Sequence, residues 1–470
     1  MKKLLSGLGL LLSMSTGLSA EPAQEVISVA TDREATALTI YNDDLALVKE
    51  RRRIALPAGL VRLSLREVSA RLRPETVLLR PLSGPPISLV EQNFDFDLLT
   101  PAKLLEKYVG REVTVIRSHP STGEDTREKA TVLAANDGVV LRFADRVETG
   151  IPGRIAFGGV PPDLRDRPTL SILLESAGGN LPLELSYLAG GLSWSTDYVA
   201  NLGADGKTMD LSGWVTLTNQ SGTAYRDVTL QLVAGTLNRV SPPEVAMVRA
   251  LAAPAPPDRK AGVSQESLAD YHLYSFGRPT SIADRQTKQL ALLSASAVPL
   301  RRSYLLAGGN WYYRQRHGQI GQKLHPDSII EFDNRGGELG KPLPAGIIRV
   351  YGRDARGGAQ FLGEDRIGHT AKGETLKIRL GEAFDITAER HQTAYRVLGE
   401  KMSESSYRIE LRNAKDQAVT VQVREPVPGD WEITQESLRH RREPAGMATW
   451  EMTVPAGGAT VLDYTARIRW

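Results

Sequence analysis

Apolar and polar residues alternate with a period of two through most of this chain, and that alternation restricts it to pleated strands. Within residues 407–413 the apolar side chains fall at odd positions and the charged ones at even positions. Residues 419–424 alternate in the same way, so we expect the two segments to form a hairpin across the turn at 414–417. The last run, 462–468, also has one apolar face, which we expect to point inward.

Turn motifs separate these runs at intervals of roughly 8–12 residues, which is typical of sandwiches and barrels. Asn136-Asp137-Gly138 and Arg335-Gly336-Gly337 are examples. We therefore predict an all-β fold of several antiparallel β-sandwich domains, with a small SH3-like barrel. One short helix is expected between Thr100, a capping residue followed by proline, and Gly110.

Composition shifts and turn clusters suggest where the domains begin and end. A proline- and alanine-rich stretch, about 238–267, has no periodicity and is expected to be a mobile loop. The predicted organisation is a signal peptide at 1–20, an N-terminal β-sandwich region at 21–105, the barrel at 106–158, a central sandwich at 159–328 and a C-terminal sandwich at 329–470.

Residues 1–20 have the pattern of a secretory signal peptide. Lys2 and Lys3 precede a short apolar run, and small residues follow it, so we expect cleavage after Ala20 or Ser19. No later segment approaches the ~20 consecutive apolar residues of a transmembrane helix, so no transmembrane anchor is expected. The protein is predicted to be periplasmic.

Charge and cysteine content exclude several classes of protein. The sequence has 58 lysine and arginine residues against 55 acidic ones, a net charge of +3, which does not suggest a nucleic-acid binder. It has no cysteine, so a lipoprotein anchor, disulfides and cysteine-ligated metals are excluded. The oligomeric state stays open.

Gly191-Leu192-Ser193-Trp194-Ser195 nearly matches the G-x-S-x-G motif of a hydrolase nucleophile. The motif requires a second glycine and a following helix, whereas this sequence has Ser195 and then a strand-like run. We therefore predict a strand, in which Trp194 anchors a core and its indole N–H finds a partner.

Candidate catalytic residues are few. Glu364, Asp365 and His369 lie in one turn-rich segment and could act as an acid–base set, or they could hold a hydrogen-bonded turn together. The histidines have no metal-ligand spacing, and the acidic pairs at 42–44 and 95–97 lack the glycine and distal glutamate of an EF-hand loop. No metal or cofactor is predicted.

Aromatic and basic residues are interleaved between Trp311 and His317. An exposed surface of this kind can stack on sugar rings or bind anionic polymers. The alternative is a strand with one solvated face, which is also the favoured reading of the cationic runs 51–53 and 439–442. The candidate binding residues are Trp311, Tyr312, Tyr313, Arg314 and Arg316.

Several stretches together resemble a bacterial envelope family known only as a domain of unknown function, which is shared with the C-terminal region of the mucoidy inhibitor A proteins. The stretches are 212–222 with Tyr225, 230–235, 271–274 with Pro279, 286–288, 341–346 with 349–351, 363–365 and 464–470. The resemblance implies an exported all-β protein and assigns no catalytic residue. The chain lacks the long N-terminal coiled coil of the mucoidy inhibitor proteins.

These observations favour an exported, non-enzymatic binding or scaffolding protein of the cell envelope, with an envelope protein or a polysaccharide as its partner. The alternative is a hydrolase or carbohydrate-binding protein that acts on an envelope polysaccharide. A hydrolase would draw its acid–base groups from Glu364, Asp365 and His369.

Overall fold

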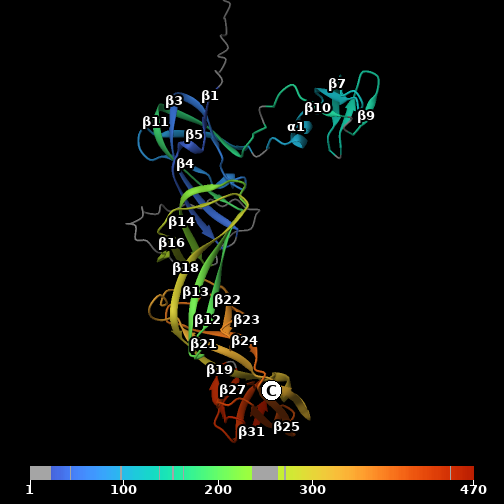
Figure 1. Ribbon diagram of the computed structural model, residues 1–470. Coiled ribbons are helices and arrows are strands. Elements are labelled where there is room, and N and C mark those ends of the chain that lie inside the picture. Colours follow the sequence, from blue (N-terminus) through green and yellow to red (C-terminus); the bar gives the residue numbers. More distant parts are fainter. Residues whose placement is uncertain are drawn as a thin grey trace, which may run out of the picture. The chain divides into compact units, whose positions relative to one another are not determined.

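The structure is a computed structural model that describes residues 23–42, 44–95, 98–136, 138–150, 153–161, 164–235, 263–268, 271–444 and 446–470. Within these ranges it contains 31 strands and one α-helix, so the all-β prediction is confirmed (Figure 1). The expected signal peptide and residues 238–262 of the expected loop lie outside the described residues. The last residues of that loop instead belong to a strand, β15 (Val263–Leu268).

The chain divides into two compact units, and each is described by itself. The first unit consists of Met1–Ala37, Leu47–Gly190 and Ser221–Val228, and the second of Leu38–Ala46, Gly191–Gln220 and Thr229–Trp470. The strands that contribute residues to both units are β2 (Arg33–Tyr41), β3 (Leu45–Arg66) and β14 (Tyr225–Ala234).

Strand pairing in the first unit joins segments that are distant in sequence. β1 (Gln24–Ser28) runs parallel to β3, with Ser28 in register with Leu65. β11 (Thr169–Ala189) is antiparallel to both β4 (Leu78–Pro81) and β5 (Ile87–Asp95). Strands from both sides of the predicted boundary at 159 therefore share one sheet. Short 3₁₀ turns lie at Ala30–Asp32 and Pro74–Thr76.

A small module of helix and sheet lies within the first unit. Thr100 caps α1 (Pro101–Lys107) by accepting a hydrogen bond from the Lys103 N–H at 3.2 Å, as predicted. Leu104 and Leu105 pack on the module's core. Its five strands, in sheet order, are β10 (Arg154–Ala156), β6 (Glu112–Ser118), β7 (Asp125–Ala134), β8 (Val140–Arg142) and β9 (Val147–Thr149).

The predicted SH3-like barrel is not closed, because β9 and β10 stand at opposite edges of this sheet. Three of its five strands have only three residues, and strands that short do not bring the two edges of a sheet together. The sheet has a buried apolar core all the same, which includes Val113, Val132 and Leu141, whereas Leu133 is partly exposed.

The second unit contains three larger sheets. The first is ordered β18 (Gln286–Pro299), β13 (Thr208–Asn219), β12 (Leu192–Leu202), β22 (Gly346–Arg353), β23 (Ala359–Ile367). The middle sheet is ordered β24 (Thr375–Glu382), β21 (Asp327–Asp333), β19 (Arg301–Ala307), β27 (Val419–Pro426), β30 (Met447–Val454), β29 (Arg441–Glu443). The last sheet is ordered β20 (Gln319–Leu324), β25 (Ile386–Gly399), β26 (Met402–Asn413), β31 (Ala459–Arg469), β28 (Asp430–Glu436). Separately, β16 (Tyr271–Phe276) pairs with β14 and β15, and β17 (Thr280–Ile282) pairs with β14.

The middle sheet contributes to two cores. Ile330 and Phe332 of β21 belong to a core with residues of the first sheet, such as Tyr198. Val421 and Val423 of β27 belong to a second core with residues of the last sheet. The predicted boundary at 328 falls inside this arrangement, since β19 and β21 pair in one sheet.

β26 and β27 do not form the expected hairpin. β26 pairs with β25 and β31 in the last sheet, and β27 pairs with β19 and β30 in the middle sheet. Their apolar faces belong to the same core. Alternation is identical whether two strands pair edge to edge or face each other across a sandwich, so the hairpin prediction was wrong. The inward face predicted for 462–468 is confirmed.

Ser193 lies in β12, in register with Thr218 of β13, so the segment is a strand as predicted. Trp194 is buried, and its ring contacts that of Tyr274 edge-on, with 6.4 Å between centroids. No residue in the described part of the chain accepts a hydrogen bond from its indole N–H, which corrects the expectation of a partner.

Candidate functional site

The structure divides the predicted aromatic and basic patch between the surface and the core. Residues Asn310–Tyr313 form a 3₁₀ turn between β19 and β20. The Trp311 side chain is 50% exposed, whereas Tyr312 and Tyr313 are buried. Arg314 and Arg316, which follow the turn, are exposed. The turn and the residues after it therefore expose one aromatic ring and two cations to solvent, while the other two rings anchor the turn in the core.

Tyr312 and Tyr313 pack on a fully buried ion pair. Arg390 of β25 and Glu425 of β27 lie on the two sheets that enclose this core, with 2.6 Å between Nη2 and Oε1. Arg390 Nη1 donates to the Tyr312 hydroxyl at 3.1 Å, and its guanidinium lies 5.0 Å from the centroid of that ring. The Tyr313 hydroxyl donates to Glu425 Oε2 at 3.3 Å. Each anchor ring is thus held by one member of the pair.

Two glycines let the turn approach this core. A Cβ on Gly308 would lie 2.0 Å from Glu425 Oε2, and a Cβ on Gly309 would lie 2.7 Å from Trp311 Nε1. Any other residue at Gly308 would therefore displace the carboxylate. The indole of Trp311 folds back over Gly309.

Three tyrosines around the pair, Tyr313, Tyr407 and Tyr464, have raised pKa values and therefore stay neutral over a wide pH range. Burial raises the pKa of Tyr313 and of Tyr464, whose hydroxyls lie 2.9 Å apart, well above the ordinary value. Burial also raises the pKa of Tyr407 to about 12. Burial raises the pKa of the Glu425 carboxyl as well, and the adjacent Arg390 guanidinium opposes that rise.

Gln392 fixes the backbone of the segment after the turn. Its Nε2 donates to the carbonyl oxygens of Tyr312 at 3.3 Å and Gln315 at 3.1 Å, and its Oε1 accepts from the His317 N–H. The Tyr407 hydroxyl also donates to the Tyr312 carbonyl, at 2.9 Å. Residues 312–317 are therefore held by side chains that project from the last sheet.

A small polar pocket of about 380 Å³ lies next to this segment. The rings of Trp311 and His317 meet edge to face with 5.0 Å between centroids, so the exposed indole stands beside a wall of the pocket. The Tyr395 hydroxyl donates to the Arg314 carbonyl at 3.3 Å and ties another part of the lining to the same segment. The pocket is lined by Arg316, His317, Gly318, Gln392, Thr393, Ala394 and Tyr395.

Glu364 and Asp365 are consecutive residues of β23, so their side chains leave opposite faces of the strand. Glu364 Oε2 lies 3.2 Å from Arg349 Nε, and Arg349 also pairs with Asp197 at 2.8 Å. The Asp365 carboxylate accepts hydrogen bonds from the backbone N–H groups of Arg366 and Arg379, each at 2.8 Å.

His369 follows β23 and has a structural contact of its own. Its Nδ1 accepts from the Ala345 N–H at 3.2 Å, and burial, together with the nearby His272, lowers the pKa of its imidazole. In the described part of the chain, then, the three candidate acid–base residues each engage a different partner.

Metal-ligand geometry is not found within the described ranges, where no three histidine, aspartate or glutamate side chains are placed to share an ion. Of the acidic pairs considered for calcium, Asp44 accepts from the Gly191 N–H at 2.8 Å. Asp43 and Asp97 lie outside the described residues. Nor does any described helix combine the length and the apolar character that crossing a membrane requires.

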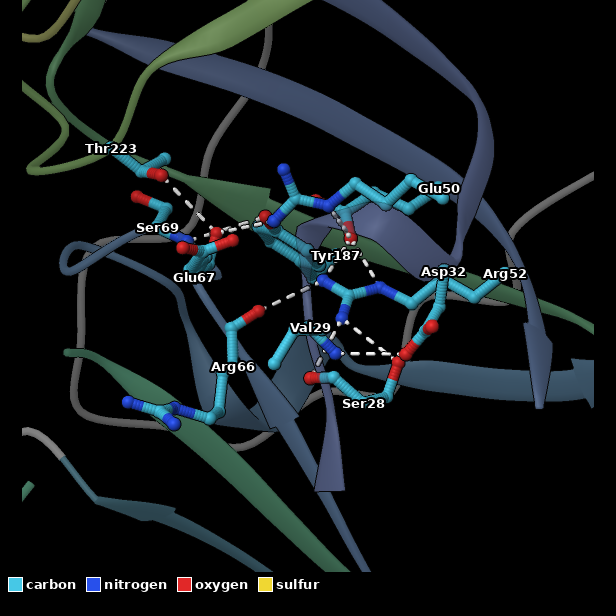
Figure 2. A network of polar contacts seen from close by, with 11 residues as sticks. Ser28, Val29, Asp32, Glu50, Arg52, Arg66, Glu67, Ser69, Tyr187 and Thr223 are labelled. Atoms are coloured by element: carbon cyan, nitrogen blue, oxygen red, sulfur yellow. Dashed lines mark hydrogen bonds and ion pairs between the residues drawn. The ribbon is translucent and has the colours of Figure 1, made fainter. Parts of the chain in front are cut away.

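The first unit contains a second buried ion pair, between Glu50 and Arg52 of β3 (Figure 2). Arg52 Nε and Nη2 donate to Glu50 Oε2 at 2.9 and 2.6 Å. The remaining donors of Arg52 bind the Ser28 carbonyl and hydroxyl and the Arg66 carbonyl, at 3.0 to 3.4 Å. Arg33 adds a bond to the same Glu50 oxygen at 3.2 Å and one to the Glu67 carbonyl at 2.6 Å.

Both buried pairs escaped prediction from the sequence, although a signal for them exists. Arg52 was considered only as part of the cationic run 51–53. The alternation of β3 places Glu50 and Arg52 on the buried face between Val48 and Ile54. Charged residues at apolar positions of an amphipathic strand indicate a buried pair. Arg390, Gln392 and Glu425 likewise occupy buried positions in the alternation of their own strands.

Comparisons with known proteins bear on the second unit above all. No curated protein matches the chain. A family model described as a domain of unknown function (DUF4139) matches residues 183–470. That match includes the 3₁₀ turn, the Arg390–Glu425 pair and the pocket, and it covers more than half of the chain. The chain therefore belongs to the DUF4139 family.

Proposed function

We propose that the protein is an exported, non-enzymatic binding protein of the bacterial cell envelope and that its ligand is a polysaccharide. The observation that carries the proposal is the half-exposed indole of Trp311 beside the polar pocket. An exposed indole offers a flat apolar face to the C–H face of a sugar ring. The pocket next to it offers the Tyr395 hydroxyl oxygen, which can accept a hydrogen bond from a sugar hydroxyl.

Preorganisation of this surface supports a binding role. The position of Trp311 is fixed from both sides. Gly309 lies against its indole, and the next residue, Tyr312, is held by Arg390, Gln392 and Tyr407. A binding surface held in one conformation loses less conformational entropy when the ligand arrives. The pocket volume falls at the small end of the range of ligand sites, about 300–1,000 Å³, which suits a short segment of a sugar chain.

The non-enzymatic part of the proposal is supported by the acid–base candidates. Glu364 forms an ion pair, Asp365 accepts hydrogen bonds from two backbone amides, and His369 accepts one from a third backbone amide.

Export is proposed from the signal-peptide pattern of residues 1–20. Kinship with the C-terminal region of the mucoidy inhibitor A proteins is proposed from the motifs of residues 160–470. Mass spectrometry of the periplasmic protein should show an N-terminus at Glu21 or Ala20. An uncut chain in the cytoplasm would contradict export.

Affinity electrophoresis against a panel of purified envelope polysaccharides tests the ligand. We expect at least one polysaccharide to retard the wild-type protein, and Trp311→Ala to abolish the retardation. Trp214 is the matched control, because it is a tryptophan of the same unit, 39% exposed on β13, and Trp214→Ala should bind normally. Equal loss in both variants, or stoichiometric capture of one protein partner without any glycan binding, would contradict the proposal.

A further inference from the structure

The pocket beside Trp311 has a cation in its wall. Arg316 lines the pocket and is exposed. No carboxylate in the described ranges pairs with Arg316, or with the exposed Arg314 two residues before it. The guanidinium of Arg316 is therefore free to bind a ligand.

Several other arginines that are partly exposed on strands of the second unit do have acidic partners. Arg408 pairs with Asp463 at 2.8 Å, Arg424 with Glu443 at 3.2 Å, and Arg467 with Glu404 at 3.0 Å. These cross-strand pairs neutralise the sheet surfaces. At the pocket the positive charge is left without a counterion from the protein.

The backbone on both sides of Arg316 is fixed. Gln392 binds the carbonyl of Gln315 and the N–H of His317, the residues before and after it. The origin of the Arg316 side chain is thus set relative to the indole of Trp311, which contacts His317. A ligand that stacks on this indole and enters the pocket would therefore meet Arg316 in the pocket lining.

We propose that the sugar bound at Trp311 carries a carboxylate on its ring, and that Arg316 binds this carboxylate. This inference rests on the proposed function. A guanidinium presents a planar fork of N–H donors that matches the two oxygens of a carboxylate, and such charge-assisted bonds are about twice as strong as neutral ones. The ligand class is therefore a uronic-acid polysaccharide.

The test compares a linear polyuronate with its carboxyl-reduced form, which has the same linkages and no charge. We expect the wild-type protein to bind the polyuronate about tenfold more tightly, the difference that one charge-assisted contact supplies. Arg316→Gln should remove this preference and retain the weaker binding of the reduced polymer. Arg396→Gln is the matched control, because Arg396 is an exposed arginine on the same strand as Tyr395 but outside the pocket lining.

Each outcome separates the inference from the proposed function. Equal binding of both polymers, lost in Trp311→Ala, would overturn the carboxylate and leave polysaccharide binding standing. A preference for the polyuronate that Arg316→Gln and Arg396→Gln reduce equally would also overturn it, since the effect would then reflect net charge alone. Binding of neither polymer, with another neutral polysaccharide bound through Trp311, would overturn it as well.

Discussion

The two units bury an arginine–glutamate pair in different ways. Arg52 of the first unit uses all three of its nitrogens, on Glu50 and on the carbonyls of Ser28 and Arg66, which fastens β1 to β3 (Figure 2). Arg390 of the second unit uses its two terminal nitrogens, on Glu425 and on the Tyr312 hydroxyl. No described residue accepts a hydrogen bond from its buried Nε.

The difference teaches what a buried charge can be used for. A pair bonded to the backbone of two strands holds these strands together. A pair bonded to the side chains of one short turn holds that turn, and through it the exposed Trp311 and the pocket. The Glu50–Arg52 pair therefore stabilises a sheet, whereas the Arg390–Glu425 pair positions the proposed binding surface.

The largest expected effect comes from removing one partner of either pair. Glu425→Gln and Glu50→Gln should each lower the free energy of unfolding by about 3–5 kcal/mol, because a buried guanidinium is left without its counterion. All six tryptophans belong to the second unit, so their fluorescence follows that unit's unfolding and circular dichroism follows both. Glu425→Gln should shift the fluorescence transition in urea. No shift would show that the pair does not stabilise this core.

Replacing both partners by apolar residues sharpens the comparison. Arg390→Met with Glu425→Leu should recover most of the lost stability, because apolar groups of similar volume often replace a buried pair without net loss. Arg52→Met with Glu50→Leu should stay less stable than wild type by about 1–3 kcal/mol, because the Ser28 and Arg66 carbonyls lose their donors. Equal recovery in both double variants would break the distinction between the pairs.

Gln392→Leu should have a smaller effect on stability and a large one on binding. The loss of its bonds to Tyr312, Gln315 and His317 is expected to lower the free energy of unfolding by about 1–3 kcal/mol. Because the segment that carries Arg316 is then no longer fixed, polysaccharide binding should weaken more than stability does. Gln435→Leu, at an exposed position of β28, is the control and should change neither.

Alternation along the chain was sufficient to predict the fold class, and local motifs predicted the helix at Thr100 and the strand at Ser193. It could not show which strands share a sheet, because β26 and β27 have the same pattern as a hairpin and yet face each other across a core. The candidate site was predicted in part. Rings and cations in 311–316 marked the segment that carries the candidate site, but a 3₁₀ turn breaks the period of two and buries Tyr312 and Tyr313.

Alkaline pH should give a still smaller effect for each residue. Burial raises the pKa of Tyr407 from 10.0 to about 12, and it raises the pKa of Tyr313 and of Tyr464 well above the ordinary value. Because the folded state keeps these protons, the stability they contribute is complete below pH 10 and falls by about 1.4 kcal/mol per pH unit for each tyrosine above it. Absorbance at 295 nm should show these tyrosines ionising only as the protein unfolds. Early ionisation without unfolding would contradict the burial of the cluster.

The most direct test of the binding surface is ¹⁹F NMR of protein labelled with 5-fluorotryptophan and titrated with the polyuronate. The six tryptophan signals are assigned by single Trp→Phe substitutions. We expect the Trp311 signal to shift on titration while those of Trp214 and the buried Trp194 and Trp450 stay in place. A shift confined to Trp214 or Trp470, or saturable binding that leaves the Trp311 signal unmoved, would contradict a binding site at Trp311.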